Sequence, residues 1–408
     1  PNFDCSMAHG VVKSYRRLYK KNLEKALDFY EIDAPADKAE EIMAKVLEED
    51  DIFPVLADDN GYADIQLPYL VELLGSEEKA ANVTRLARIH GKKETERDTF
   101  QAMEALVHNL NTMHSRAGAQ VPFSSLNYGT DTSPEGQLVI RSILRSTEAG
   151  MGGGETAIFP IHIFKVKEGI NYNPGDPNYE LFQYACKVSA QRLFPNFSFL
   201  DAPFNLPYYQ EGKPETEAAY MGCRTRVIAN NFDTSQEITN GRGNLSFTSI
   251  NLPRIAIKSN GDVDMFFDEL EEKMELVFDQ LMARFEIIAD KKVRNFPFLM
   301  GEGIWIDSDK LNPDDSVREV LKHGTLTVGF IGLAEALKAL IGSHHGESEQ
   351  AQNLGLDIIG FMRAQCDQKT KETGFNYTLI ATPAEGLSGR FVKIDREKFG
   401  EIPGVTDR

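Results

Sequence analysis

One cysteine, Cys223, lies in a setting that could support chemistry at sulfur. It follows a glycine and precedes an arginine in Met221-Gly222-Cys223-Arg224-Thr225-Arg226, and no second cysteine lies within 30 residues. Such an isolated cysteine is poorly placed for a disulfide or a zinc knuckle and indicates a single sulfur at a loop tip. Thiolate and thiyl chemistry both need an accessible sulfur, and a neighbouring guanidinium favours the reactive anion. The alternative is a buried structural cysteine, the commonest fate of an unpaired thiol.

A glycine-containing turn after a predicted strand could bind an anion. The strand is predicted at Asn376–Ala381, and Thr382-Pro383-Ala384-Glu385-Gly386-Leu387-Ser388-Gly389-Arg390 leads from it into a helix. The free N–H groups of a helix start, together with the helix dipole, favour a phosphate at this position. A plain turn between strand and helix is the alternative.

A second turn of small residues could approach a ligand closely. His114-Ser115-Arg116-Ala117-Gly118-Ala119-Gln120 joins a predicted helix at 95–113 to a predicted strand at 121–126. Arg116 could contact a phosphate or a base. The alternative is a helix C-cap, in which Gly118 provides the left-handed turn and Arg116 faces the last carbonyl groups.

Two further motifs indicate chemistry only weakly. Gly150-Met151-Gly152-Gly153-Gly154-Glu155 lacks the GxGxxG spacing and follows no strand, so it favours a flexible loop over a dinucleotide site. His344-His345-Gly346-Glu347 places two histidines side by side, and such side chains point in different directions. A shared metal ion would therefore need further ligands, and solvated or hydrogen-bonded histidines are favoured.

The bulk properties limit the class of protein. The chain has 408 residues, 41% of them hydrophobic, and a net charge of -18, which argues against a general binder of nucleic acid. Its four cysteines, at 5, 186, 223 and 366, form no metal pattern and favour a reducing compartment. Neither a signal peptide nor a run of 18 apolar residues is present, so we expect a soluble cytoplasmic protein without a membrane segment.

The elements that must position these residues alternate between helices and strands. Helices are predicted at 8–30, 37–49, 65–75, 95–113, 135–148, 178–193, 262–290, 333–341 and 347–372. Strands are predicted at 121–126, 159–164, 198–200, 325–330 and 376–381, with one or two more between Leu245 and Ile257. This alternation predicts parallel β-α-β units in a single large α/β domain.

Taken together, the loops resemble those of the anaerobic, class III ribonucleoside-triphosphate reductases, which are glycyl radical enzymes. The resemblance covers nearly the whole chain and is strongest from about Glu96 to Arg408. The matching strings are Asn109-Leu110-Asn111, Ser115-Arg116-Ala117-Gly118-Ala119-Gln120-Val121-Pro122-Phe123, Met221-Gly222-Cys223-Arg224-Thr225, Arg242-Gly243-Asn244-Leu245-Ser246-Phe247, His323-Gly324-Thr325-Leu326 and Thr382-Pro383-Ala384-Glu385-Gly386-Leu387.

The resemblance implies a fold and a reaction. The fold is a ten-stranded α/β barrel of two parallel five-stranded halves, with a finger loop through its centre and Cys223 at the tip of that loop. The reaction is the anaerobic reduction of ribonucleoside triphosphates to deoxyribonucleoside triphosphates. Cys223 becomes a thiyl radical that abstracts the ribose 3′ hydrogen, the 2′ hydroxyl leaves as water, and formate supplies the reducing equivalents.

The resemblance also assigns residues to the pocket. Met221 and Asn244 line it beside Cys223, and Asn244 could hydrogen-bond the ribose hydroxyls. The substrate phosphates would lie on Pro383, Ala384, Glu385, Gly386 and Leu387. A second wall is formed by Ser115, Arg116, Ala117 and Gly118, and no metal ligand is expected in this segment.

Cofactors and partners follow from the same resemblance. We expect a glycyl radical and a structural zinc on a C-terminal segment after Arg408, and an N-terminal ATP cone before Pro1. ATP and deoxynucleotides would act as effectors, and a radical-SAM enzyme would activate the protein. The helix at 95–113 is a candidate surface for a homodimer.

The expected domain organisation is a single catalytic barrel, 1–408, with a helical region at 1–93 that leads into the main barrel at 94–408. Because it carries the radical relay cysteine but no radical store, the chain should not turn over alone. One alternative is a non-catalytic nucleotide-binding paralogue. Another is a different glycyl radical enzyme, against which the phosphate turn and Arg242-Gly243-Asn244 argue.

Overall fold

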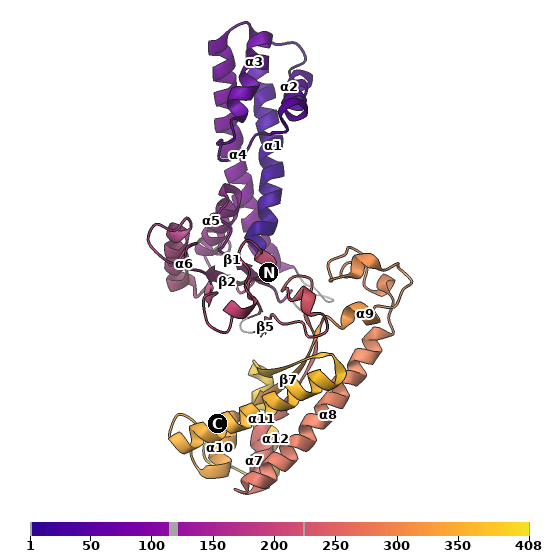
Figure 1. Ribbon diagram of the computed structural model, residues 1–408. Helices are drawn as coiled ribbons and strands as arrows, with labels where there is room; N and C mark the ends of the chain where they lie inside the picture. Colours follow the sequence, from indigo (N-terminus) through magenta and orange to yellow (C-terminus); the bar gives the residue numbers. More distant parts are fainter. Residues whose placement is uncertain (1, 114–120, 223–224, 408) are drawn as a thin grey trace. The chain divides into compact units, whose positions relative to one another are not determined.

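The chain divides into two compact units, Pro1–Arg226 and Val227–Arg408, each with a three-stranded parallel sheet (Figure 1). The computed structural model describes residues 2–113, 121–222 and 225–407, except for the side chains of Val227 and Glu385. No helix within these described ranges is long and apolar enough to span a membrane.

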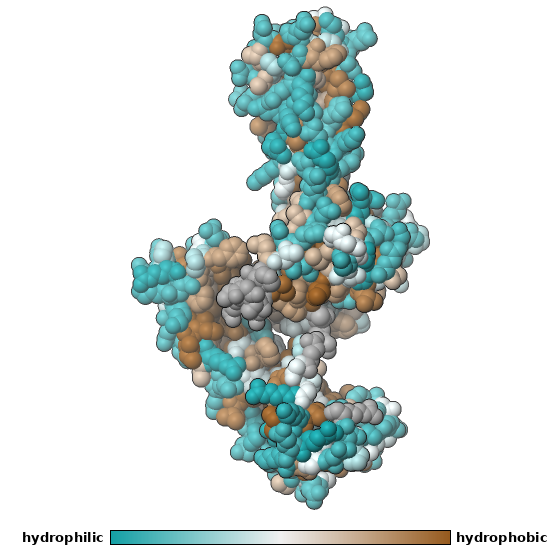
Figure 2. Space-filling view, turned by 180° about the vertical axis from the view of Figure 1, so that it is seen from behind, coloured by the Kyte–Doolittle hydropathy of each residue, from teal (hydrophilic) through white to brown (hydrophobic). Residues whose placement is uncertain are grey.

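The first unit joins a group of long helices to a small sheet. Its elements are α1 (Phe3–Phe29), α2 (Pro35–Asp50), α3 (Tyr62–Leu74), α4 (Glu77–Thr112), β1 (Ser125–Tyr128), α5 (Pro134–Ala149), β2 (Ile161–Val166), α6 (Tyr179–Arg192), β3 (Asn196–Phe199) and β4 (Ala219–Met221), followed by β5 (Thr225–Val227) at the junction with the second unit. Helices α1 and α4 lie side by side, with α2 and α3 beside them at the end away from the sheet (Figure 1). That helical end is largely hydrophilic (Figure 2).

Strand β2 occupies the centre of the first sheet, in the order β1-β2-β3. All six of its residues are buried. A central parallel strand is paired along both edges and covered by helices, so a short, mostly apolar run suits it. The connections through α5 and α6 are the β-α-β crossovers that parallel pairing requires.

The second unit is built around the sheet β6-β7-β8. Its elements are β6 (Asn244–Asn251), α7 (Leu252–Ser259), α8 (Val263–Ala289), α9 (Arg318–Leu321), β7 (Thr325–Ile331), α10 (Leu333–Ile341), α11 (Glu349–Thr373), β8 (Asn376–Ala381) and α12 (Glu385–Phe399). Helix α8 packs on β6 and β7, and α11 packs on β8. A second apolar core forms there, around Phe266, Leu270 and Phe278.

Most predicted elements are present, and prolines explain the bounds of two of them. The strand predicted at 121–126 begins only at Ser125, because Pro122 has no N–H for a ladder. Between Leu245 and Ile257 there is one strand, and the rest is α7, where Pro253 lies in the first turn and Asn251 Oδ1 accepts from the Arg254 N–H. Proline is well suited to the first helical turn because its missing N–H is not needed there.

The α/β fold is confirmed, but the finer architecture stays a prediction. In the described ranges the strands form two three-stranded sheets and one pair, β4-β5, and do not by themselves make a ten-stranded barrel. The predicted boundary between residues 93 and 94 falls inside α4.

Candidate functional site

The turn before Cys223 is defined by a glycine. Cys223 and Arg224 lie outside the described residues, but Met221 ends β4 and Gly222 follows with a φ of +60°. A Cβ at Gly222 would lie 3.1 Å from a ring carbon of Phe123, so both the backbone conformation and the space favour glycine. The Gly222 N–H donates to Ser125 Oγ at 3.1 Å, which ties this turn to β1.

Asn244 presents an unpaired oxygen at the start of β6. It lies beside Thr325 of β7, and its Oδ1 is buried with no hydrogen-bond partner among the described residues. A buried carbonyl oxygen without a donor is unfavourable, and few such groups remain in a folded protein. This oxygen is therefore suited to accept a hydrogen bond from a hydroxyl of a bound ligand.

Arg242 holds the chain that precedes Asn244. Its guanidinium donates to four backbone carbonyl oxygens, those of Ile228 (3.1 Å), Ile238 (3.0 Å), Ala229 (2.8 Å) and His323 (2.9 Å). Burial lowers the pKa of Arg242 to about 10. Because its donors point at backbone, Arg242 has a structural role and does not offer a free cation to an anionic ligand.

His323 receives a role that the sequence motif did not specify. Its Nδ1 lies 3.0 Å from Asn230 Nδ2 and its Nε2 lies 3.3 Å from Asp307 Oδ2. The Asn230 amide can only donate, so Nδ1 accepts and Nε2 carries the proton toward Asp307. Burial lowers the pKa of His323, against the opposing effect of Asp307. A buried, neutral His323 thus orders the amino end of β7.

The turn after β8 has the features expected of an anion site. The Thr382 N–H donates to the Phe330 carbonyl at 3.0 Å, and its hydroxyl lies 2.7 Å from Ser249 Oγ. Helix α12 starts at Glu385, and the N-cap residue Ala384 provides no capping side chain. The first N–H groups of a helix have no partner within it, so they remain suited to a phosphate.

Two groups of residues that the sequence assigned to one pocket lie at opposite ends of the β6-β7-β8 sheet. Asn244 lies at the amino end of the sheet, whereas the 382–387 turn follows its carboxyl end. Ser249, which contacts Thr382, is five residues further along β6 than Asn244, or about 17 Å at the rise of a strand. The predicted wall at Ser115–Gly118 lies outside the described residues.

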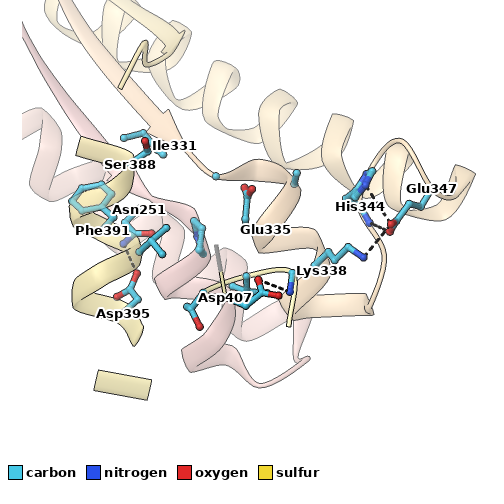
Figure 3. Close-up of a pocket in the computed structure, with 17 residues that line it drawn as sticks. Asn251, Ile331, Glu335, Lys338, His344, Glu347, Ser388, Phe391, Asp395 and Asp407 are labelled. Carbon is cyan, nitrogen blue, oxygen red and sulfur yellow. Dashed lines mark hydrogen bonds and ion pairs between the residues drawn. The ribbon is translucent and has the colours of Figure 1, made fainter. Parts of the chain in front are cut away.

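A cavity of about 410 Å³ that the sequence did not indicate lies between α10 and α12 (Figure 3). Asn251 Nδ2 donates to Asp395 Oδ2 at 2.7 Å, and Lys338 Nζ lies 3.0 Å from Glu347 Oε1. Its lining comes from several elements, so no sequence motif marks it. Carboxylates outnumber cations there, which disfavours an anionic ligand.

His344, the first residue of the His344-His345 pair, is tied to a carboxylate in the same neighbourhood. His344 Nε2 lies 3.3 Å from Glu347 Oε1, as the hydrogen-bonded interpretation predicted. Among the residues that the structure describes, no cluster of three or more His, Cys, Asp or Glu could hold a metal ion.

Comparison of the sequence with known proteins gives a consistent result. The family described as "Anaerobic ribonucleoside-triphosphate reductase" matches residues 1–408. The anaerobic ribonucleoside-triphosphate reductase of Salmonella typhimurium is 34% identical over 355 residues, which cover 86% of this chain and 48% of that protein. The chain thus spans about half the length of the curated relatives it matches.

Solved structures show the same relationship at the level of the fold. The anaerobic ribonucleotide reductase from Thermotoga maritima with citrate in the active site matches with a TM-score of 0.54 at 14% identity, over 95% of this chain and 77% of that one. The same enzyme in complex with dATP and CTP gives a TM-score of 0.50 at 17% identity, over 76% of this chain and 50% of that one. The chain belongs to the anaerobic ribonucleoside-triphosphate reductase family.

Proposed function

We propose that this chain carries the catalytic region of an enzyme that reduces ribonucleoside triphosphates to deoxyribonucleoside triphosphates without oxygen. The observation that carries the proposal is the match of the family along all 408 residues. The unpaired buried oxygen of Asn244 and the uncapped start of α12 support it, because they suit a sugar hydroxyl and a phosphate.

Each site residue has a proposed task. Cys223, as a thiyl radical, takes the ribose 3′ hydrogen. Asn244 accepts a hydrogen bond from a ribose hydroxyl while the 2′ hydroxyl leaves as water, and Met221 lines the pocket beside them. The backbone N–H groups of residues 384–387 bind the triphosphate, with Pro383 beside them, and Ser115–Gly118 form a further wall.

The remaining requirements of the reaction belong to the complete protein. A stored glycyl radical supplies the unpaired electron, and formate supplies the reducing equivalents. We further propose a ten-stranded barrel with a helical region at 1–93 and a main region at 94–408, in a homodimer. A radical-SAM activating enzyme, a structural zinc, and ATP and deoxynucleotide effectors complete the proposal, with the cytoplasm as its location.

The test is a pair of cysteine variants in the complete natural polypeptide. Cys223→Ala should abolish formate-dependent reduction under anaerobic conditions, because the reacting sulfur is lost, while nucleotide binding measured by calorimetry is unchanged. Cys186→Ala, which removes an exposed thiol on α6, should leave turnover intact. Turnover by the Cys223→Ala variant would exclude the proposed function.

A further inference from the structure

The strand that begins with Asn244 has an irregularity directly after that residue. Asn244 pairs with Thr325 and Ser246 pairs with Leu326, so β6 advances by two residues while β7 advances by one, and Leu245 is the extra residue. Such a β-bulge interrupts the strict alternation of side chains along a strand and can re-aim a side chain. The direction of the Asn244 side chain is therefore set by the bulge and not by a regular pleat.

A glycine beside the bulge leaves the space that Leu245 occupies. A Cβ at Gly324 would lie 2.6 Å from Leu245 Cγ, 2.8 Å from its Cδ2 and 3.0 Å from its Cδ1, so a larger residue would overlap the leucine. Leu245 packs against the apolar core of the second unit, and a close-packed core leaves it little room to move. Side-chain packing at the bulge thus requires glycine at position 324.

The backbone of Gly324 is fixed by hydrogen bonds and cannot easily yield to the leucine. The Gly324 N–H donates to the Leu321 carbonyl at 2.9 Å, and the Asn376 amide nitrogen lies 3.3 Å from the Gly324 carbonyl oxygen. A methyl group added at position 324 would therefore displace Leu245 and, with it, the adjoining backbone of Asn244.

We propose that Gly324 and Leu245 are positioning residues for Asn244, because the bulged leucine, packed on the glycine, aims the carboxamide at the ribose hydroxyl. This inference rests on the proposed function, in which Asn244 accepts a hydrogen bond from that hydroxyl. The buried Asn244 Oδ1 has no partner among the described residues. It gains a hydrogen bond from the ligand only when the distance and angle to the donor are suitable, so its direction matters.

The test asks whether Gly324→Ala and Asn244→Leu affect the same interaction. Both variants are made in the complete natural polypeptide, and CTP binding is measured by calorimetry with dATP at saturation, so that the proposed effector sites are already filled. Each single variant should weaken CTP binding about fivefold, the effect of losing one hydrogen bond. The double variant should also lose only about fivefold, because Gly324→Ala then has no carboxamide left to misdirect.

Three results would overturn the positioning role. One is a loss of about twenty-five-fold in the double variant, which is the product of two independent effects. Another is wild-type affinity in either single variant. The third is an equal loss in a control glycine variant, Gly355→Ala, which adds a Cβ 3.3 Å from Leu337 Cδ1 in the same unit and should leave CTP affinity unchanged.

A variant that removes atoms keeps the test valid if Gly324→Ala does not fold, which the fluorescence of Trp305 in the same core would reveal. Leu245→Ala empties the space beside Gly324 and should weaken CTP binding about threefold, because Asn244 is held less firmly. Adding Gly324→Ala to Leu245→Ala should cost nothing further, since the atoms that the new methyl group would overlap are gone. A further fivefold loss, about that of one hydrogen bond, would contradict the packing argument.

These outcomes are distinct from a failure of the proposed function. Turnover by Cys223→Ala would refute the proposed reaction. Independent effects of Gly324→Ala and Asn244→Leu on CTP binding would refute only the positioning role, even if Cys223→Ala is inactive.

Discussion

At the residue scale, the Asn244 side chain carries an oxygen that no described residue of the fold uses. Its Oδ1 is buried and unpaired among the described residues. We expect Asn244→Leu to leave the free energy of unfolding unchanged or to raise it by up to about 1 kcal/mol, because an unsatisfied buried oxygen is removed. Turnover of the complete enzyme should fall strongly. Urea denaturation and a reductase assay measure the two effects.

Asn230, a second asparagine of the same unit, is the control for Asn244→Leu. Its side chain is fully buried and bonded to His323 and to the Gln236 carbonyl. Asn230→Leu should therefore lower stability, unlike Asn244→Leu. If Asn244→Leu destabilised the protein to the same extent, a structural role for Asn244 would be indicated.

A buried histidine makes the stability of the first unit depend on pH. His162 lies 3.3 Å from both Tyr128 Oη and Thr147 Oγ1, and the Thr147 hydroxyl already donates to the Ile143 carbonyl. Nε2 must therefore carry the proton and Nδ1 must accept from Tyr128. Burial lowers the pKa of His162 from 6.5 to about 4, so the neutral ring is the form that fits.

This shift predicts loss of stability in mild acid. His162 takes up a proton near pH 6.5 in the unfolded state but only near pH 4 in the folded state. The contribution of neutral His162 to the free energy of unfolding is therefore complete above pH 6.5 and falls as the pH drops between these values. The loss is on the order of 3 kcal/mol across the window. Urea midpoints at pH 7.5 and 5 should differ less in His162→Gln than in the wild type, whereas the exposed His9→Gln should keep the wild-type difference.

Cys223 and Asn244 could be proposed as site residues from the sequence, but the long-range contacts of other asparagines could not. Cys223 is noticeable by its isolation and by its glycine and arginine neighbours, which are local features. Asn127 and Asn376 act on backbone groups 93 and 145 residues away in the chain. No local pattern distinguishes such an asparagine from one in an ordinary turn, so these contacts could be found only from the structure.

At the scale of elements, the turn after β8, residues 382–387, is held by a pair of hydroxyl groups, those of Ser249 and Thr382. Thr382 Oγ1 lies 2.7 Å from Ser249 Oγ, and Gly329 of the central strand leaves room for them, since a Cβ there would lie 2.2 Å from the Thr382 hydroxyl. We expect Thr382→Val to weaken nucleotide binding by about fivefold, the effect of losing one hydrogen bond that holds the turn. Isothermal calorimetry with a ribonucleoside triphosphate measures it.

A second threonine pair supplies the control for that variant. Thr327 Oγ1 and Thr378 Oγ1 lie 2.8 Å apart within the same sheet, away from the turn. Thr378→Val removes a comparable bond and should not change nucleotide affinity. Similar losses in both variants would mean that the sheet, and not the turn, determines binding.

Element prediction succeeded where the pattern is local and failed where it is short or interrupted. The strand at 376–381 and the helix at 333–341 are present with the predicted bounds, because a continuous apolar run and a periodic stripe mark them. Strands β4 and β5 have three residues each, too few for any periodicity, and were not predicted. The start of α4 at Glu77 was also missed, although Ser76 caps it by accepting from the Lys79 N–H.

At the scale of the whole molecule, the two units have separate apolar cores. One core lies within residues 11–188 and another within 250–377, and they share no residue. The single tryptophan, Trp305, is buried in the second core, where its indole N–H donates to the Val320 carbonyl at 2.7 Å. Tryptophan fluorescence therefore reports on the second unit.

These cores predict separable unfolding. Leu270→Ala should lower the urea midpoint followed by tryptophan fluorescence, since removing a fully buried leucine costs about 2–5 kcal/mol. Leu144→Ala, in the first core, should leave the fluorescence midpoint unchanged. It should lower the urea concentration at which the first loss of helical signal is seen by circular dichroism. Equal shifts in both probes for both variants would show one cooperative unit instead.

The four carbonyl bonds of Arg242 have a consequence for how much the chain around them can vary. A backbone stretch normally enters the dry interior only as helix or strand, because its carbonyl groups need partners. Here one side chain supplies those partners for residues 228, 229 and 238, so the stretch needs no regular repeat of its own. The sequence and backbone path of this stretch can therefore vary as long as the Arg242 guanidinium is kept. Lysine, with one compact ammonium group, could not replace Arg242.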